Sequence, residues 1–458
     1  MEARVQLLNS AQFRDDAKYV LYWAQMNRRV AWNHALNYAA ELANRARLPL
    51  LFYEGLTCAY PYASDRLHTF ILEGVPDTAQ QLTKLGIGYV FYLRRGRADP
   101  DDMLYRLAKD AAAIVTDDYP AFIARRHNEH VPSRVAIPYY AVDSSCIVPM
   151  TEMTKREYGA YTIRPKIRKL LARYLRPVEP LRVRRPFDLR LPTPSTNVTA
   201  ANVPELVGSC EIDHSVRPSP LFRGGSTEAA KRLRGFLRRN LSRYATFRNE
   251  PSAHATSSLS PYLHFGHLSS LQTALAVRDY AAEHKLMADD FLEELIVRRE
   301  LAFNFARFTE RPDSLENLPD WAQKTLAKHA RDKRDPLYSP DQFERAATHD
   351  DLWNAVQKEL LMRGKIHGYY RMYWGKKIIE WSKTPAEALQ TMIYLNDRYA
   401  LDGRDPNGYA NILWCFGLHD RPWIERPIFG QVRYMSYAGM RRKTDVDAYI
   451  REIESEFK

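Results

Sequence analysis

Tyr19-Val-Leu-Tyr-Trp23 is a short apolar run of strand-forming residues, and it sets the pattern of the first 150 residues. Four runs of the same kind follow it, at 48–53, 88–93, 113–116 and 135–139. Between the runs, apolar residues recur at helical spacing over 30–43, 64–85, 100–112 and 119–126. Buried strands that alternate with amphipathic helices are typical of a parallel sheet covered on both faces. We therefore predict a doubly wound, Rossmann-like α/β domain over residues 1–150.

The turn after the first predicted strand argues against one large class of such domains. It reads Ala24-Gln-Met-Asn-Arg28 and lacks the Gly-x-Gly-x-x-Gly with which dinucleotide-binding sheets approach a pyrophosphate. The sequence thus predicts a nucleotide-like fold without the phosphate-binding loop.

The character of the sequence changes twice after residue 150. Residues 151–215 are basic and contain Leu191-Pro-Thr-Pro-Ser-Thr196, so we expect one or two basic helices and then an extended linker. From residue 216 to 458 strand patterns largely vanish, and we predict an all-α domain. Its predicted helices cover 227–245, 269–282, 289–308, 343–348, 351–364, 365–382, 385–397 and 444–457.

The composition of the 458 residues excludes several classes of protein. A hydrophobic fraction of 45% with 12% aromatics excludes a disordered chain. No apolar run reaches the roughly 18–20 residues of a membrane-spanning helix, and charged residues at 14–18 interrupt any secretion signal. The four cysteines lie far apart, which indicates neither a zinc site nor a disulfide framework. We expect a soluble, unexported protein with reduced thiols, no metal and no membrane partner.

The positive charge is distributed unevenly. The net charge is +12, yet residues 1–150 hold 17 basic and 16 acidic side chains, so the later part carries +11. This asymmetry favours a polyanionic partner for the later part. A solvated basic surface with no partner is the alternative.

One candidate ligand site is a cluster of hydroxyls in Thr256-Ser-Ser-Leu-Ser260, directly before a helix opened by Pro261. Hydroxyl and free N–H groups at a helix N-terminus bind anions, and a pyrophosphate is the natural ligand. A cluster of this kind also commonly serves only to cap the helix.

A second candidate is the aromatic segment 365–381. Trp374 and Trp381 are seven residues apart, so on a helix they share nearly one face and lie roughly 10.5 Å apart along the axis. Such pairs usually pack a core. With Trp353 of the preceding predicted helix between them, they could also pass electrons between a buried redox cofactor and the surface.

Two more segments carry polar chemistry. Residues 396–414 form a long loop of amides, carboxylates, Gly and Pro, and these groups suit the edge of a flavin-like ring; a set of Asx turns is the alternative. Residues 419–443 interleave arginines with Trp423, Tyr434 and Tyr437. That composition is typical of a surface for phosphates and unstacked bases, or of solvated charge alone.

Together these segments resemble the photolyase and cryptochrome family, and within it the class II cyclobutane pyrimidine dimer photolyases. The resemblance extends over nearly the whole chain. Its most specific motifs are Glu294-Leu-Ile-Val-Arg-Arg-Glu-Leu-Ala-Phe-Asn304, Gly368-Tyr-Tyr-Arg-Met-Tyr-Trp374, Leu395-Asn-Asp-Arg-Tyr-Ala-Leu-Asp-Gly-Arg-Asp-Pro-Asn-Gly408 and Arg433-Tyr-Met-Ser-Tyr437. It implies an N-terminal antenna domain, a linker and a helical domain that holds FAD. It also implies light-driven repair, in which excited, reduced FAD donates an electron to the dimer, the cyclobutane ring splits and the electron returns.

The resemblance implies roles for individual residues around the flavin. Those matching phosphate-binding positions are Tyr244, Thr256, Ser257, Ser258, Leu259 and Ser260. Asn396 matches the residue that faces flavin N5, and Arg371 and Asp402 match a charged pair beside the ring. Those matching a tryptophan chain that reduces oxidised flavin under light are Trp353, Trp374 and Trp381.

Further positions match the side that meets DNA. Glu294, Met372 and Trp414 match the lesion pocket, whereas Arg298 stands where some relatives carry a second aromatic clamp. Asp420 and Arg421 match the loop that fills the hole left by the flipped dimer. We expect Arg441 and Lys443 to contact phosphates.

Other functions remain open within the sequence. A cryptochrome-like photoreceptor without repair would share the flavin and the tryptophan chain, but many such proteins carry a long tail, and here the chain stops at Lys458 after its last predicted helix. Repair of the (6-4) photoproduct relies on a histidine pair that His264 and His367 are not placed to match. A nucleic-acid-binding protein without flavin is a third alternative.

The resemblance leaves the antenna undecided between a deazaflavin, a folate and no chromophore. We expect a monomer that binds UV-damaged DNA. The corresponding location is the cytoplasm, with the nucleoid, or the nucleus in a eukaryotic cell.

Overall fold

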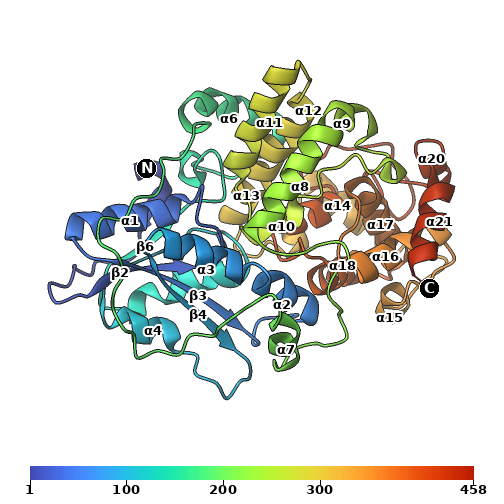
Figure 1. The fold of residues 1–458 in the computed structure, drawn as a ribbon. Coiled ribbons are helices and arrows are strands. Elements are labelled where there is room, and N and C mark those ends of the chain that lie inside the picture. Colours follow the sequence, from blue (N-terminus) through green and yellow to red (C-terminus); the bar gives the residue numbers. More distant parts are fainter. Residues whose placement is uncertain (458) are drawn as a thin grey trace.

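A six-stranded sheet forms one side of the molecule and helices form the other, in a computed structural model that describes residues 1–457 (Figure 1). The strands are β1 (Val5–Leu7), β2 (Tyr19–Ala24), β3 (Leu50–Thr57), β4 (Gly88–Arg94), β5 (Ala111–Asp117) and β6 (Tyr139–Val142). Their order across the sheet is β1-β6-β5-β2-β3-β4, and every pair is parallel except β1 with β6. The predicted doubly wound parallel sheet is confirmed, with a short antiparallel edge strand added.

The strand predicted over 135–139 exists but lies further along the chain, because the pairing begins only at Tyr139 and continues to Val142. Pro138 has no N–H to give to a neighbouring strand, and only its carbonyl pairs, accepting from Ile114 N at 2.8 Å. The apolar residues before it therefore lie in the approach to the strand.

The helices around the sheet are α1 (His34–Ala46), α2 (Asp65–Leu72), α3 (Val75–Lys84), α4 (Met103–Ala108) and α5 (Phe122–His130). The single helix predicted over 64–85 is two helices separated at Gly74. A Cβ on Gly74 would lie 2.7 Å from Nε2 of His267, a residue of the helical second half of the chain. A small residue is therefore required where that half approaches the junction of α2 and α3. The predicted helix 100–112 is shorter than expected because Ala111 already belongs to β5.

The turn after β2 is closed by a carboxylate from the neighbouring strand. Asp117, at the end of β5, is fully buried, and its Oδ2 accepts hydrogen bonds from the backbone N–H groups of Gln25, Met26 and Asn27 at 3.0, 2.8 and 2.9 Å. Dinucleotide-binding sheets present the same turn to a phosphate. Here the chain supplies the anion itself.

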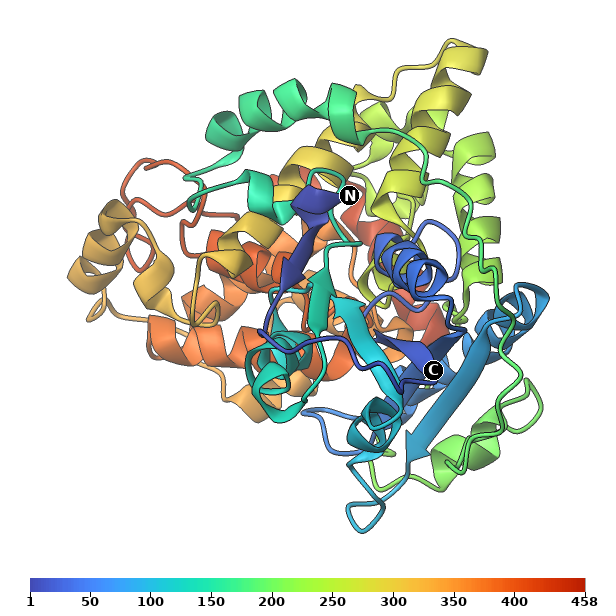
Figure 2. The ribbon, with the colours of Figure 1, turned by 90° about the vertical axis from the view of Figure 1, so that its left-hand side faces the viewer.

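The basic segment after residue 150 contains α6 (Ala160–Tyr174) and α7 (Val203–Gly208), joined by extended chain that runs along the α/β half (Figure 2). Asn37 and Asn44 of α1 donate to the carbonyls of Glu179 and Arg182, at 2.7 and 2.8 Å. On the other side, Thr196 N donates to Phe91 O of edge strand β4 at 2.7 Å. The linker is therefore fixed to the sheet it covers.

The second half is helical, as predicted. Its helices are α8 (Ser226–Arg239), α9 (Leu241–Phe247), α10 (Ser260–His264), α11 (Ser270–His284), α12 (Asp289–Leu292), α13 (Arg299–Arg307), α14 (Asp320–Lys328), α15 (Pro340–Glu344), α16 (Asp351–Arg363), α17 (Gly368–Trp381), α18 (Pro385–Tyr399), α19 (Pro406–Trp414), α20 (Tyr437–Arg441) and α21 (Val446–Glu456). The helix predicted over 289–308 contains one π-helical segment, Glu293–Arg298, between α12 and α13.

The two halves share a buried boundary. Arg66 of α2 is 1% exposed and donates to the carbonyls of Leu360 and Tyr399, at 3.1 and 2.7 Å. Phe70 of α2 packs on Phe265 with ring centroids 5.1 Å apart. Across residues 1–457 no helix has the length and apolar character needed to cross a bilayer.

Candidate active site

A cavity of about 560 Å³ opens in the helical half, where α9, the π-helical segment, α17, α18 and α19 converge with Thr256 to Ser260, here called the hydroxyl segment. Most of the residues singled out from the sequence line it, although they come from segments up to 170 positions apart. They are Tyr244, Thr256, Ser257, Ser258, Leu259, Ser260, Glu294, Arg298, Arg371, Met372, Trp374, Asn396, Asp402 and Trp414.

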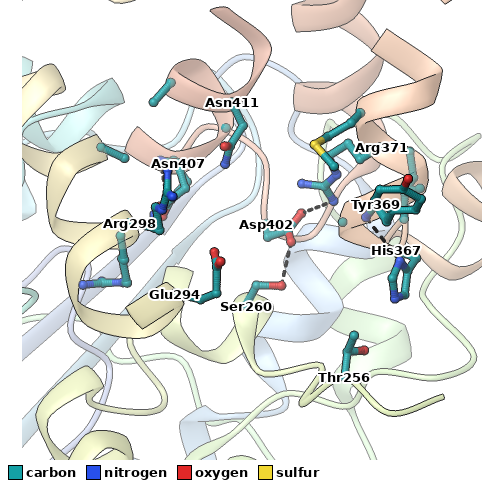
Figure 3. Close-up of a pocket in the computed structure, with 18 of the residues that line it drawn as sticks. Thr256, Ser260, Glu294, Arg298, His367, Tyr369, Arg371, Asp402, Asn407 and Asn411 are labelled. Carbon is teal, nitrogen blue, oxygen red and sulfur yellow. Dashed lines mark hydrogen bonds and ion pairs between the residues drawn. The ribbon is translucent and has the colours of Figure 1, made fainter. Parts of the chain in front are cut away.

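A buried ion pair lies at the centre of the cavity (Figure 3). Asp402 accepts from Arg371 Nη2 at 2.9 Å through Oδ1 and from the Ser260 hydroxyl at 2.6 Å through Oδ2. Burial would raise the pKa of the Asp402 carboxyl, but the charges of Arg371 and Lys365 and these hydrogen bonds outweigh it and hold that pKa well below its ordinary value. Asp402 is therefore an anion, and the Ser260 hydroxyl donates its hydrogen bond to this carboxylate. The helix α10 is a single turn, so its dipole is small. The polar groups at this wall of the cavity are therefore mainly the side chains of the hydroxyl segment.

Two cavity residues to which the sequence patterns assign no role in ligand binding lie beside this pair. Lys365 and His367 precede α17, and no spacing pattern marks them. His367 Nδ1 accepts from Tyr369 N at 3.2 Å, and burial lowers the pKa of His367 to about 3, so the neutral ring carries its proton on Nε2. Within residues 1–457 that Nε2 and Arg371 Nε are buried without a partner. Two unused donors beside a cavity fit a ligand rich in acceptors and negative charge.

The loop between α18 and α19 is held in one shape by its own side chains. Asp397 accepts from Arg404 N at 2.8 Å and from the Tyr409 hydroxyl at 3.0 Å. Asn396, which lines the cavity, is 4% exposed and donates to Asp397 Oδ1 at 3.1 Å. A Cβ on Gly403 would lie 2.6 Å from Asn396 O, so the close turn requires glycine. The loop is thus a rigid wall.

A second carboxylate ties the cavity to the α/β half. Asp405 Oδ2 accepts from the Tyr119 hydroxyl at 2.7 Å and lies 3.0 Å from His264 Nδ1, while Oδ1 caps α19 through Asn407 N at 2.8 Å. Burial opposes the charge, but the hydrogen bond and charge of His264 and the Tyr119 hydroxyl lower the pKa of Asp405. His264 and His367 both line the cavity, but the Nδ1 of His264 is hydrogen-bonded to Asp405 and the Nδ1 of His367 accepts from Tyr369 N.

The mouth of the cavity is charged and accessible. Glu294 and Arg298, both from the π-helical segment, are exposed there. Arg248 Nη1 donates to Glu294 Oε1 at 3.2 Å. The wider turn of a π-helix occurs frequently at functional sites, and here it presents both side chains to the opening.

The three candidate tryptophans are buried and adjacent. Trp374 lines the cavity, and its carbonyl accepts from Trp353 Nε1 at 3.0 Å. The rings of Trp353 and Trp381 have centroids 6.2 Å apart. Beyond them, Trp381 contacts the exposed His349 at a centroid distance of 5.0 Å. The aromatic path from the cavity wall towards the surface thus runs through a hydrogen bond to a main-chain carbonyl between Trp374 and Trp353, and through ring contacts from Trp353 onwards.

The remaining candidates lie outside the cavity. Asp420 accepts from Trp423 Nε1 at 3.3 Å, and the Arg421 guanidinium lies 5.1 Å from the Trp423 ring. The neighbouring Ile424 is 84% exposed. Arg441 is exposed and paired with Asp447 at 2.5 Å, and Lys443 is exposed.

Two solved structures share this architecture. A cryptochrome from Synechocystis matches with a TM-score of 0.75, covering 96% of this chain and 89% of its own. A class III photolyase from Agrobacterium tumefaciens matches with a TM-score of 0.70, over 96% and 87%. Each is 17% identical to this chain, which shows the shared fold alone.

The sequence comparisons define the family. The model for DNA photolyase matches residues 20–185. The deoxyribodipyrimidine photo-lyase of Methanothermobacter thermautotrophicus is 42% identical over 98% of both chains. Those of Arabidopsis thaliana and Potorous tridactylus are 40% and 38% identical, over 95% and 98% of this chain and 89% and 84% of theirs. The chain belongs to the DNA photolyase family.

Proposed function

We propose that this protein is a deoxyribodipyrimidine photo-lyase, which uses light to split cyclobutane pyrimidine dimers in DNA. The observation that carries this function is the sequence identity of about 40%, over nearly the whole of this chain, to photo-lyases from an archaeon, a plant and a marsupial. The cavity agrees with it, because it joins a buried charged centre to an exposed mouth that carries Glu294 and Arg298.

FAD fits the buried centre of the cavity, where it supplies the light-driven electron to the lesion. Arg371 and Asp402 would lie beside the ring, and the cationic side chains there would favour its anionic reduced form. Asn396 would face N5. The unpartnered donors of Arg371 and His367 suit ring carbonyls or phosphate oxygens. The positions proposed for the phosphates are Tyr244, Thr256, Ser257, Ser258, Leu259 and Ser260.

The mouth suits a flipped dimer, and the motifs there favour class II. We assign Glu294 to a hydrogen bond with a pyrimidine carbonyl or N–H, and Trp414 and Met372 to contact with the bases. Arg298 can stack on a base through its guanidinium. Asp420 and Arg421 would enter the duplex, while Arg441 and Lys443 would hold phosphates. A dimer is poorly stacked, so flipping it costs less than flipping intact bases.

The aromatic path supports a second assignment. Trp374 would be the residue that gives an electron to an oxidised flavin under light, and Trp353 and then Trp381 would replace that electron. This route would restore the reduced flavin that repair needs.

The decisive experiment illuminates the purified, reduced protein with oligonucleotides that hold one thymine dimer and scores restored thymines. We expect restoration under light and none in the dark. Full reduction of a bound flavin without restored thymines would contradict repair and favour a photoreceptor. A colourless protein that takes up no FAD would contradict both.

We further propose that residues 1–150, 151–215 and 216–458 act as antenna domain, linker and catalytic domain of a monomer that works where the cell keeps its DNA. Mass analysis of the pigments released from the native protein distinguishes a deazaflavin, a folate and no antenna. Light scattering with and without duplex DNA tests the monomer.

A further inference from the structure

Two tryptophans, Trp374 and Trp414, line the same cavity but differ in their electrostatic surroundings. Trp374 donates its indole N–H to Gln357 Oε1 at 2.9 Å, and among residues 1–457 no Lys or Arg lies over its ring. Trp414, the last residue of α19, has two cations over its ring: Lys376 Nζ at 5.1 Å and Arg433 Cζ at 5.7 Å from the centroid. Both distances are within the range of cation–π attraction.

Lys376 is unusual because it is fully buried without a carboxylate partner. Its side chain has no exposed area, and its Nζ donates to the carbonyl of Cys415, just past the end of α19, at 2.5 Å. The neighbouring Lys377 also faces an indole, that of Trp381, at 5.4 Å, but it is paired with Glu380 at 2.6 Å. The charge of Lys377 is balanced locally, whereas that of Lys376 acts on Trp414 through a medium of low dielectric.

We propose that Lys376 selects the electron donor: its buried ammonium makes Trp414 harder to oxidise, so that the flavin takes its electron from Trp374. The inference rests on the proposed photoreduction route. In that step one electron leaves the Trp374 indole for the photoexcited oxidised flavin, so the indole is oxidised and the flavin reduced. A positive charge beside Trp414 opposes the same loss, because the oxidised ring would also be positive. Lys376 is thus a positioning residue, since it acts through its charge on Trp414 and not on the flavin. It protects from oxidation the indole that we assign to the lesion.

The direct test measures whether the ammonium acts on the ring. In the FAD-loaded protein in the dark, the near-ultraviolet spectrum of wild type minus W414F isolates Trp414, and the same difference in a K376M background shows the ring without the charge. We expect the two difference spectra to be shifted relative to each other. Identical spectra would overturn the inference whatever the flavin does. Met keeps the length of Lys without its charge.

A pH titration tests the same point without the substitution. Burial lowers the pKa of Lys376 to about 8, so its ammonium is lost as the pH rises from 7 to 9.5. Other groups that face it are Cys415, just past the end of α19, and further along the chain Asp420 and Arg433, with Lys377 on its own helix. We expect the Trp414 spectrum to change with a midpoint near pH 8 in wild type and to stay constant in K376M. A change that persists in K376M would assign it to another group and contradict the inference.

Flash photolysis tests the choice of donor. We expect W374F to lose most photoreduction at pH 7, W374F/K376M to regain about tenfold in tryptophan-radical yield, and W374F/K376M/W414F to lose it again. If W374F/K376M behaves as W374F, the role of Lys376 is wrong while the Trp374 route stands. If W374F alone photoreduces as wild type, the proposed route fails, and the spectral comparison still decides the role of Lys376.

Discussion

At the scale of the residue, Asp402 is the centre of the site. Its two oxygens join α17 to the hydroxyl segment through Arg371 and Ser260, although these residues are 111 positions apart in the chain. A carboxylate held anionic in a buried place fixes the charge of its neighbours and the positions of their donors.

We expect Asp402→Asn to weaken FAD binding strongly. The amide keeps the shape, but Arg371 is left without a counter-charge, and breaking a buried pair in this way costs about 3 kcal/mol. Equilibrium titration of the apoprotein with FAD measures the loss. Ser260→Ala is the matched control, since it removes one hydrogen bond to the same carboxylate and should cost only about 1 kcal/mol. Equal losses in the two variants would show that the charge is not what matters.

Trp414 and Lys443 should affect DNA binding in different ways. Trp414→Ala removes a stacking surface, so we expect lesion preference to fall by about 1–3 kcal/mol with the salt dependence unchanged. Lys443→Ala and Arg441→Ala should weaken binding to damaged and undamaged duplexes alike and lower the salt slope by about one unit per lost contact. Fluorescence anisotropy at several salt concentrations separates the two effects. The placement of the DNA face would be wrong if neither quantity moved.

At the scale of the element, the short connections between helices determine how closely neighbouring elements pack. Gly266, between α10 and α11, has φ +70°, and a Cβ there would lie 1.9 Å from the carbonyl oxygen of Met26 in the turn after β2. This one position therefore sets how closely the helical half approaches the sheet.

We expect Gly266→Ala to destabilise the protein by at least about 2 kcal/mol, because the left-handed conformation and the backbone overlap both oppose a side chain. Urea unfolding measures the change. Gly208→Ala, at the end of α7, is the matched control, since nothing lies within 4 Å of its Cβ. A loss confined to the control, or absent from both, would contradict this account of the junction.

The elements that the sequence predicts well are those with a repeated local pattern. Apolar runs such as 19–23 and 88–93 are strands, and the amphipathic helices fall near their predicted places. The π-helical segment was not predicted, because one wider turn leaves the helical spacing of apolar residues almost unchanged. Lys365 and His367 were not assigned to ligand binding either, since their place in the cavity depends on how α17 packs and not on spacing. The contact of Tyr119 with Asp405 spans 286 positions, and no local pattern records it.

At the scale of the whole molecule, the two halves are joined by buried polar groups. Glu300 of α13 accepts through Oε1 from the backbone N–H groups of Ile147 and Val148, at 2.6 and 3.1 Å. Those residues follow the last strand of the sheet. Burial raises the pKa of Glu300 to about 8, despite the hydrogen bonds, so at neutral pH the junction contains a protonated carboxyl group.

This protonation should make stability fall as the pH rises. The folded pKa exceeds the unfolded one, so between about pH 4.5 and 8 the folded state binds the extra proton and the free energy of unfolding decreases with pH. The contribution is complete below pH 4.5 and lost above 8, by an amount of the order of 5 kcal/mol. Unfolding in urea across this range, for wild type and Glu300→Gln, isolates the group because the amide still accepts both N–H bonds. A difference between the two that did not vary with pH would contradict the assignment.

Asp117 acts as an intramolecular ligand for the turn after β2. Because the carboxylate belongs to the same chain as the three amides it binds, its effective concentration at that turn is at least of the order of millimolar. A phosphate from solution would have to displace the Asp117 carboxylate, because the three backbone N–H groups of this turn already donate to it. The sheet keeps the topology of a nucleotide-binding protein, but the three donors of its first turn are already occupied by a side chain of the same chain.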